Sequence, residues 1–186
     1  PGPGLKDVID VDVAIVGGGY TGLSTAYFLK KAEPGKRVAL LEAEVIGFGA
    51  SGRNAGFSMT KFGLIHSITA VRFGKEKTRE AHEYNCRAVD LLRDLVTTLK
   101  LDCDYEHNGF LMVSTCKKHQ QRMEREYEFV TKKLGIGEIE WIDERELKSR
   151  VDSPIYMGGA WWEPRTGILN PAKLAWSWKK VIEQMG

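Results

Sequence analysis

The stretch from Val13 to Glu42, VAIVGGGYTGLSTAYFLKKAEPGKRVALLE, decides the fold of this chain. A short apolar run, Val13–Val16, leads directly into the glycine-rich segment Gly17–Gly22, and a helical pattern follows. A second apolar run, Val38–Leu41, ends on the acid Glu42, 20 residues after the last of these glycines. A strand, a GxGxxG turn, a helix and a strand ending in an acid together predict a dinucleotide-binding βαβ unit.

Each position of this pattern has a physical role. Gly17 allows a sharp turn out of the first strand, Gly19 leaves room for a pyrophosphate, and Gly22 lets the helix pack closely. The phosphates are expected at the helix N-terminus, where backbone N–H groups favour an anion. Glu42 is expected to accept hydrogen bonds from both ribose hydroxyls and to repel a 2′-phosphate, which disfavours NADP.

Composition excludes several classes of protein. The 186 residues are 42% hydrophobic and 28% charged, as in ordinary globular proteins. The net charge of +2, with both signs interspersed, gives no reason to expect a nucleic-acid partner. The sequence has no apolar run of about 18 residues, so no transmembrane segment is expected. The N-terminal stretch PGPGLKDVIDVD also lacks the basic start and apolar core of a secretory signal.

The cysteines and histidines predict neither disulfides nor a metal site. Cys86, Cys103 and Cys116 are odd in number and form no CxxC pair, so we expect free thiols and a cytoplasmic location. The four histidines share no spacing typical of metal ligands.

Periodicity and turn residues predict the elements that follow Glu42. A Gly-rich loop comes first, and an amphipathic helix then runs from about Lys75 to Leu99. Asn108-Gly109 predicts a hairpin within Cys103–Ser114. Further helices are expected to begin after two capping residues, Asp143 and Asn170.

These elements predict an α/β fold with two parts. A Rossmann-like nucleotide-binding domain is expected over residues 1–102 and 163–186, and part of an antiparallel-sheet substrate domain over residues 103–162. The last predicted helix reaches Gly186 with no strand after it, and the middle segment offers few strands. We therefore expect the first half of a larger protein, with a partner chain or a second copy covering its open face.

A second motif after Glu42 narrows the cofactor. The loop Gly47–Gly56, GFGASGRNAG, directly follows LLEA, and the first motif reads VGGGYTGLSTA. Together they resemble the FAD-dependent D-amino-acid-oxidase superfamily, which includes glycine oxidase and sarcosine oxidase, and most of all its γ-glutamylputrescine-oxidase-like members. The chain departs from the pattern at Ala55, where a glycine is common.

The resemblance implies FAD as cofactor and a set of binding residues. The pyrophosphate is expected at the glycine fingerprint, the adenosine ribose after the second strand, the ribitol and pyrophosphate in the following loop, and the isoalloxazine at its end. The implied residues are, in that order, Gly17, Gly19, Tyr20, Thr21 and Gly22; Glu42 and Ala43; Ala50, Ser51, Arg53 and Asn54; and Ala55, Gly56 and Phe57.

The resemblance also implies an enzyme that oxidises a C–N bond of an amine or amino acid by hydride transfer to flavin N5. It identifies no catalytic acid or base in this chain. An alternative is a flavin-binding fragment or subunit without turnover of its own, completed by a partner chain. A third hypothesis, an NAD-dependent dehydrogenase, is disfavoured by the loop Gly47–Gly56.

Overall fold

The structure, a computed structural model, describes residues 4–61 and 63–186, which divide into two compact units. Unit 1 comprises the described part of Pro1–Phe57 together with Asp94–Tyr105 and Ile168–Gly186. Unit 2 comprises Ser58–Arg93 and Glu106–Gly167, as far as they are described. Which of these units binds cofactor and which binds substrate stays a prediction.

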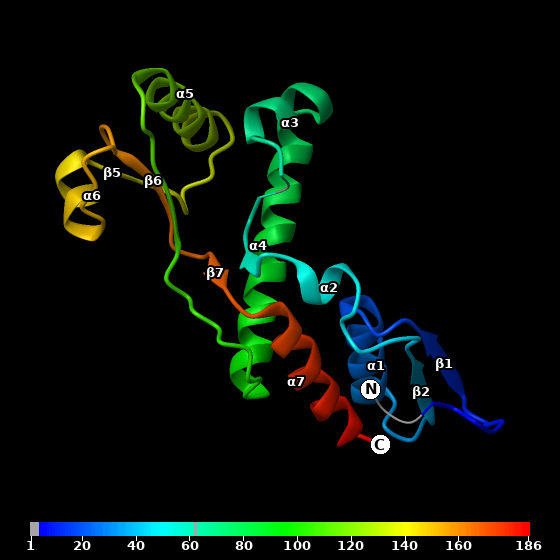
Figure 1. Ribbon diagram of the computed structural model, residues 1–186. Coiled ribbons are helices and arrows are strands. Elements are labelled where there is room, and N and C mark those ends of the chain that lie inside the picture. The colour runs from blue at the N-terminus through cyan, green and yellow to red at the C-terminus, as the bar shows by residue number, and fades with distance from the viewer. Residues whose placement is uncertain (1–3, 62) are drawn as a thin grey trace. The chain divides into compact units, whose positions relative to one another are not determined.

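Unit 1 contains the βαβ unit that the sequence predicts. Strand β1 (Val13–Val16) is followed by helix α1 (Tyr20–Ala32) and strand β2 (Val38–Leu41). The two strands pair in parallel, from Val13 opposite Val38 to Val16 opposite Leu41, and Figure 1 shows α1 beside them. The crossover through a helix is what a parallel pair requires.

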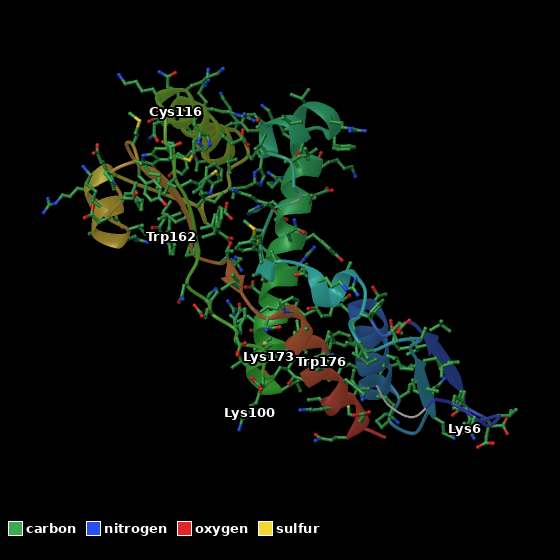
Figure 2. The ribbon with its side chains drawn as sticks, in the orientation of Figure 1. Lys6, Lys100, Cys116, Trp162, Lys173 and Trp176 are labelled. Carbon is green, nitrogen blue, oxygen red and sulfur yellow. The ribbon has the colours of Figure 1, made fainter. Side chains whose placement is uncertain are left out.

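Helix α7 (Pro171–Glu183) completes the core of unit 1 by packing against α1. The Tyr27 and Trp178 rings lie 5.9 Å apart, and Leu23 and Leu174 are buried with them. Trp176, two residues before Trp178 and labelled in Figure 2, keeps 52% of its surface exposed, because two tryptophans two residues apart cannot share one helix face.

Capping residues begin two of the helices as the sequence predicts. The Asn170 side chain accepts a hydrogen bond from the Lys173 N–H at 3.1 Å, with Pro171 at the first helical position. In unit 2 the Asp143 side chain accepts from the Glu146 N–H at 2.8 Å and starts α6 (Glu144–Arg150). Both contacts satisfy a helix N–H that has no partner within its helix.

Unit 2 is built on a three-stranded antiparallel sheet in the order β4-β6-β5. Its strands are β4 (Phe110–Met112), β5 (Glu140–Ile142) and β6 (Ala160–Glu163). Trp161 of β6 is buried in a cluster that also contains Met123, Val130, Leu134, Ile136 and Ile139. The remaining helical elements of unit 2 are α3 (His66–Phe73), most of α4 (Lys75–Thr98), α5 (Lys117–Glu128) and a π-helical turn (Phe129–Lys133).

Two predictions of secondary structure need correction. Residues 103–114 do not form a local hairpin: β4 pairs with β6, and Gly109 lies against the Trp162 ring, which a Cβ there would approach to 2.2 Å. The Gly-rich loop after Glu42 contains the short helix α2 (Ala50–Arg53) and leads into β3 (Phe57–Ser58). A last short strand, β7 (Gly167–Ile168), precedes α7.

Among the helices of residues 4–61 and 63–186, none is both long enough and apolar enough to cross a membrane. The three cysteines are free thiols, with Cys86 and Cys103 buried and Cys116 exposed.

Candidate cofactor-binding site

The glycine fingerprint forms a tight turn between β1 and α1. Gly17 has φ of +104°, a region that residues with a Cβ rarely adopt, and its N–H donates to the Leu41 carbonyl at 2.8 Å. A Cβ at Gly22 would lie 1.9 Å from the Gly17 carbonyl oxygen, so only glycine fits there. A Cβ at Gly19 would lie 2.9 Å from Ser51 Oγ. At Gly22 and Gly19 the turn is therefore packed closely against the protein's own atoms.

Helix α1 presents its N-terminus at this turn without an acid of its own. Gly19 is the N-cap and has no side chain to cap the helix, and the first turn carries no acidic residue. Backbone N–H groups and the positive end of the helix dipole make such a terminus favourable for a phosphate.

Glu42 is held against the fingerprint. Its Oε2 accepts a hydrogen bond from the Gly18 N–H at 2.7 Å, and its Oε1 accepts from the Glu44 N–H at 3.0 Å. These hydrogen bonds, that of Gly18 first, lower the pKa of the Glu42 carboxyl below its usual value. Glu42 is therefore an ionised acceptor at neutral pH, with lone pairs left for further donors.

The loop after Glu42 folds back onto the same turn. The Gly47 N–H donates to the Gly18 carbonyl at 2.9 Å, and Ser51 Oγ accepts from the Tyr20 N–H at 3.0 Å. The two motifs that the sequence shows in series are thus parts of one site in unit 1.

Asn54 and Gly56 fix the end of this loop. Asn54 Nδ2 donates to the carbonyls of Ala50 and Ser51, and its Oδ1 accepts from the Gly56 N–H at 2.8 Å. Gly56 has φ of +78°, and a Cβ there would lie 1.9 Å from the Leu169 carbonyl oxygen. The backbone therefore passes close to the start of α7, as only glycine allows.

The other predicted residues take less constrained places. The Arg53 guanidinium lies 4.3 Å from the centre of the Phe48 ring, a cation–π contact rather than an ion pair. Phe57 is 57% exposed. Four small or polar residues on the site's surface are exposed, namely Thr21, Ala43, Ala50 and Ala55. Their cofactor contacts stay predictions.

The Tyr20 side chain has a structural partner in unit 1. Its hydroxyl donates to the Pro171 carbonyl at 2.8 Å, which connects the fingerprint to the first turn of α7. Burial raises the pKa of the Tyr20 phenol to about 12, which keeps it a hydrogen-bond donor at neutral pH. The hydroxyl and the backbone N–H of Tyr20 thus both have partners within unit 1, and a contact of Tyr20 with the pyrophosphate stays a prediction.

Gly18 and Gly47 belong to this site, although the sequence analysis did not select them. Gly18 is the middle residue of the triplet and donates to Glu42, and a Cβ on it would lie 2.4 Å from Ile46 Cδ1. The unbroken run of three glycines is the signal that marks it, because the fingerprint itself requires only two of them.

Comparison with known proteins agrees with this geometry. Residues 12–186 match the sequence model of the family described as FAD dependent oxidoreductase. The chain belongs to that family. Its members use FAD, and the matched residues include both the glycine fingerprint and the loop that docks on it.

Individual relatives support the assignment to this family. Gamma-glutamylputrescine oxidoreductase of Escherichia coli (strain K12) is 33% identical over 171 residues, which cover 92% of this chain and 39% of the relative. Sarcosine oxidase subunit beta of Rhodobacter capsulatus is 27% identical over 181 residues, covering 94% and 40%. The crystal structure of glycine oxidase from Geobacillus kaustophilus aligns with a TM-score of 0.73 at 25% identity, covering 95% and 45%. The chain thus spans about two fifths of the length of the curated relatives it matches.

A second group of polar side chains lies in unit 2. His82 and Cys86 of α4 and Glu138 before β5 bring their nitrogen, sulfur and oxygen atoms within 4.8 Å of one another. The prediction of no metal site rests on the spacing of the histidines and on the lack of a CxxC pair. It does not cover a mixed pair, such as a histidine and a cysteine four residues apart on one predicted helix.

Proposed function

We propose that unit 1 binds the adenosine and pyrophosphate part of FAD, and that the whole protein oxidises a C–N bond of a small amine or amino acid. The observation that carries the proposal is the docking of the loop Gly47–Gly56 onto the fingerprint through Gly18 and Ser51. This arrangement places the two FAD-like motifs around one helix N-terminus.

The residues present suit the cofactor. Helix α1 supplies an N-terminus whose first turn carries no acidic residue to compete with a phosphate. Glu42 supplies an ionised carboxylate that can accept hydrogen bonds from ribose hydroxyls. Arg53 adds a positive charge to the same loop, where it can offset phosphate charge.

When bound, the flavin supplies the acceptor for the hydride that leaves the carbon beside the amine nitrogen. The chain's own residues then bind and orient. Backbone N–H groups at the fingerprint hold the phosphates, and Glu42 fixes the ribose.

The substrate class rests on relatives. The names of the Escherichia coli, Rhodobacter capsulatus and Geobacillus kaustophilus relatives each specify an amine or amino acid.

The free thiols of Cys86, Cys103 and Cys116 favour a reducing compartment such as the cytoplasm.

A flavin-binding chain without turnover of its own, completed by a partner, is the second candidate. Val16 at the end of β1 is 85% exposed and Leu41 of β2 is 36% exposed, so the two-stranded sheet has an uncovered apolar surface. One relative is itself named as a subunit, the sarcosine oxidase subunit beta.

The test is cofactor binding by the purified 186-residue chain. The chain is incubated with FAD, free flavin is removed, and the retained flavin is measured by its visible absorbance. We expect flavin to be retained, and Glu42→Ala to weaken its binding roughly tenfold or more by removing charged hydrogen-bond acceptors. Glu44→Ala is the matched control, because it removes a neighbouring carboxylate but keeps the backbone N–H that Glu42 accepts.

A chain that retains no flavin contradicts the proposal for unit 1, and equal affinity in both variants contradicts the role of Glu42. Turnover is read separately by mixing the loaded chain with amines and amino acids without dioxygen. Bleaching of the flavin by one of them supports oxidation by this chain, whereas bound flavin that no substrate bleaches favours the second candidate.

A further inference from the structure

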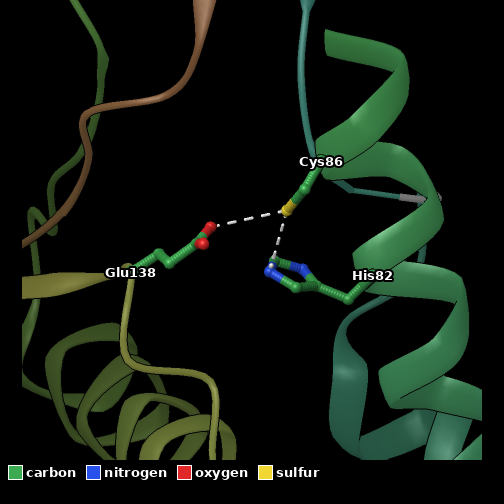
Figure 3. A group of neighbouring side chains, drawn as sticks. All are labelled: His82, Cys86 and Glu138. Carbon is green, nitrogen blue, oxygen red and sulfur yellow. Dashed lines mark hydrogen bonds between the residues drawn. The ribbon is translucent and has the colours of Figure 1, made fainter. Parts of the chain in front are cut away.

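Three side chains of unit 2 present metal-binding atoms to one another (Figure 3). Cys86 Sγ lies 3.4 Å from His82 Nε2 and 3.5 Å from Glu138 Oε2. His82 and Cys86 are four residues apart on α4 and therefore share one helix face, while Glu138 comes from the segment before β5. Nitrogen, sulfur and oxygen from two separate segments thus converge at one point.

The spacing of these atoms suits a tetrahedral ion. Zinc binds imidazole nitrogen, thiolate sulfur and carboxylate oxygen at roughly 2.0–2.3 Å, so neighbouring ligands of a tetrahedron lie about 3.3–3.8 Å apart. Two of the three observed separations fall in this range, and all three are within 4.8 Å. A small movement of one side chain brings the set around an ion.

A second histidine orients His82. His66 Nε2 lies 3.4 Å from His82 Nδ1, and both residues are buried. If His82 Nδ1 carries the proton and donates it to His66, then Nε2 keeps its lone pair directed at Cys86. Metal-binding histidines usually have such an outer hydrogen bond, which fixes the tautomer and the ring orientation.

The surrounding charges balance a divalent ion. A Cys86 thiolate and the Glu138 carboxylate together neutralise two positive charges, and the thiol proton is released to solvent on binding. Arg165 donates to both oxygens of Glu138, from Nη2 to Oε1 at 2.7 Å and from Nε to Oε2 at 3.0 Å, and it also donates to Asp90. The guanidinium therefore keeps a carboxylate partner in Asp90 when Glu138 turns to a metal.

A cavity of about 430 Å³ in unit 2 is lined by all three candidate ligands together with Arg165 and Asp90. A fourth position on an ion at this point is open to that cavity and can be filled by water. Three protein ligands and one open position are the arrangement of zinc sites that bind an exchangeable group.

We propose that His82, Cys86 and Glu138 form a binding site for a divalent transition-metal ion of the Zn²⁺ type. The sulfur and nitrogen ligands select against Mg²⁺ and Ca²⁺, which prefer oxygen. All three residues lie within unit 2.

Cobalt(II) is the probe, because it occupies zinc sites and its thiolate bond gives a charge-transfer absorbance in the near ultraviolet. The full 186-residue chain is treated with a chelator, exchanged into metal-free buffer and titrated with Co²⁺. We expect the charge-transfer band to saturate at one equivalent and to disappear when Zn²⁺ is added. Cys86→Ser abolishes the band, whereas Cys116→Ser, which changes an exposed thiol outside the site, leaves it intact.

Two further variants test the geometry. Glu138→Gln changes an exposed residue and is expected to weaken Co²⁺ binding at least tenfold. This variant tests the metal site even if Cys86→Ser fails to fold. His66→Leu removes only the orienting hydrogen bond and is expected to weaken binding about 10- to 100-fold. Absence of a thiolate band in the wild type, or unchanged Co²⁺ affinity in Glu138→Gln, overturns the proposal.

Discussion

Tyr20 makes two hydrogen bonds that serve different parts of unit 1. Its backbone N–H donates to Ser51 Oγ and so holds the second motif against α1. Its hydroxyl donates to the Pro171 carbonyl, which lies 151 residues later in the sequence. One residue of the fingerprint therefore connects the cofactor loop with the last helix.

The Tyr20 phenol gives a pH dependence with a definite sign. Its pKa rises from 10.0 in the unfolded chain to about 12 in the folded one, so its contribution is fully present below pH 10 and is lost as the pH rises toward 12. Tyr20→Phe is expected to lower the free energy of unfolding by about 1 kcal/mol at neutral pH. The variant also lacks the loss of stability that ionisation of the Tyr20 phenol causes at alkaline pH. Urea unfolding at several pH values measures this difference.

Tyr84→Phe is the control, because it removes a hydroxyl from a side chain that is 64% exposed. The free energy of unfolding of Tyr84→Phe should depend on pH as that of the wild type does. If Tyr20→Phe and the wild type lose stability in parallel above pH 10, burial does not raise the pKa of the Tyr20 phenol in the folded chain.

Residue roles in the candidate site were predictable only where they depend on local sequence. The positive φ of Gly17 and the tight fit of Gly22 follow from a fingerprint that spans six residues. The hydrogen bond from the Gly18 N–H to Glu42 joins residues that are 24 positions apart, and the contact of Arg53 with Phe48 depends on side-chain conformation. A linear sequence motif specifies neither of these two contacts.

Helix α7 shows how strongly an element can depend on its first residue. Asn170 satisfies the Lys173 N–H, and Pro171 occupies the position where a missing N–H does no harm. The helix then places Leu174 and Trp178 against α1. Its start therefore sets the rotation of the whole packed face.

Asn170→Ala is expected to lower the free energy of unfolding by about 1 kcal/mol, because it leaves a helix N–H without its acceptor. Asn170→Asp keeps an acceptor at the same position and should stay close to the wild type. Urea unfolding gives the energy, and hydrogen exchange of the Lys173 amide locates the change. Equal exchange at Lys173 in all three proteins would contradict the capping role.

The long helix α4 and the parallel pair β1–β2 were predictable from local sequence, whereas the short helices α2 and α3 and the pairing of β4 were not. Periodicity and caps are local, and they gave α4 as about Lys75–Leu99 against Lys75–Thr98 in the structure. The pairing of β4 is long-range: Phe110 lies opposite Glu163, not opposite a neighbouring strand. Asn108-Gly109 is a turn signal, but the Trp162 ring, 53 residues later, explains why glycine is needed there.

On the scale of the molecule, unit 2 is held by a buried ion pair between distant segments. Lys61 Nζ lies 2.9 Å from Glu163 Oε1, and only 3% of the Glu163 side chain is exposed. Glu163 also accepts hydrogen bonds from Trp161 Nε1 at 2.7 Å and from Thr60 Oγ1 at 3.2 Å. The carboxylate thus joins strand β6 to the segment that precedes α3.

Lys61→Met leaves that carboxylate buried without its counter-charge and is expected to destabilise the protein by about 3–5 kcal/mol. The double variant Lys61→Met/Glu163→Gln removes the charge but keeps an acceptor for Trp161, so it should be more stable than Lys61→Met alone. Urea unfolding of both single variants and the double variant gives the coupling energy. Strict additivity of the two substitutions would contradict a buried pair.

Unit 1 is assembled from three separate segments, and this has a consequence for synthesis on the ribosome. About 110 residues separate Phe57 from Ile168. Tyr20 of the fingerprint lies 151 residues before Pro171. At the usual rate of roughly 5–20 residues per second, the fingerprint therefore emerges about 8–30 s before the helix that supplies the Pro171 acceptor. During that interval α1 lacks its packing partner, and a nascent chain paused there offers apolar side chains of α1, such as Leu23, to chaperones.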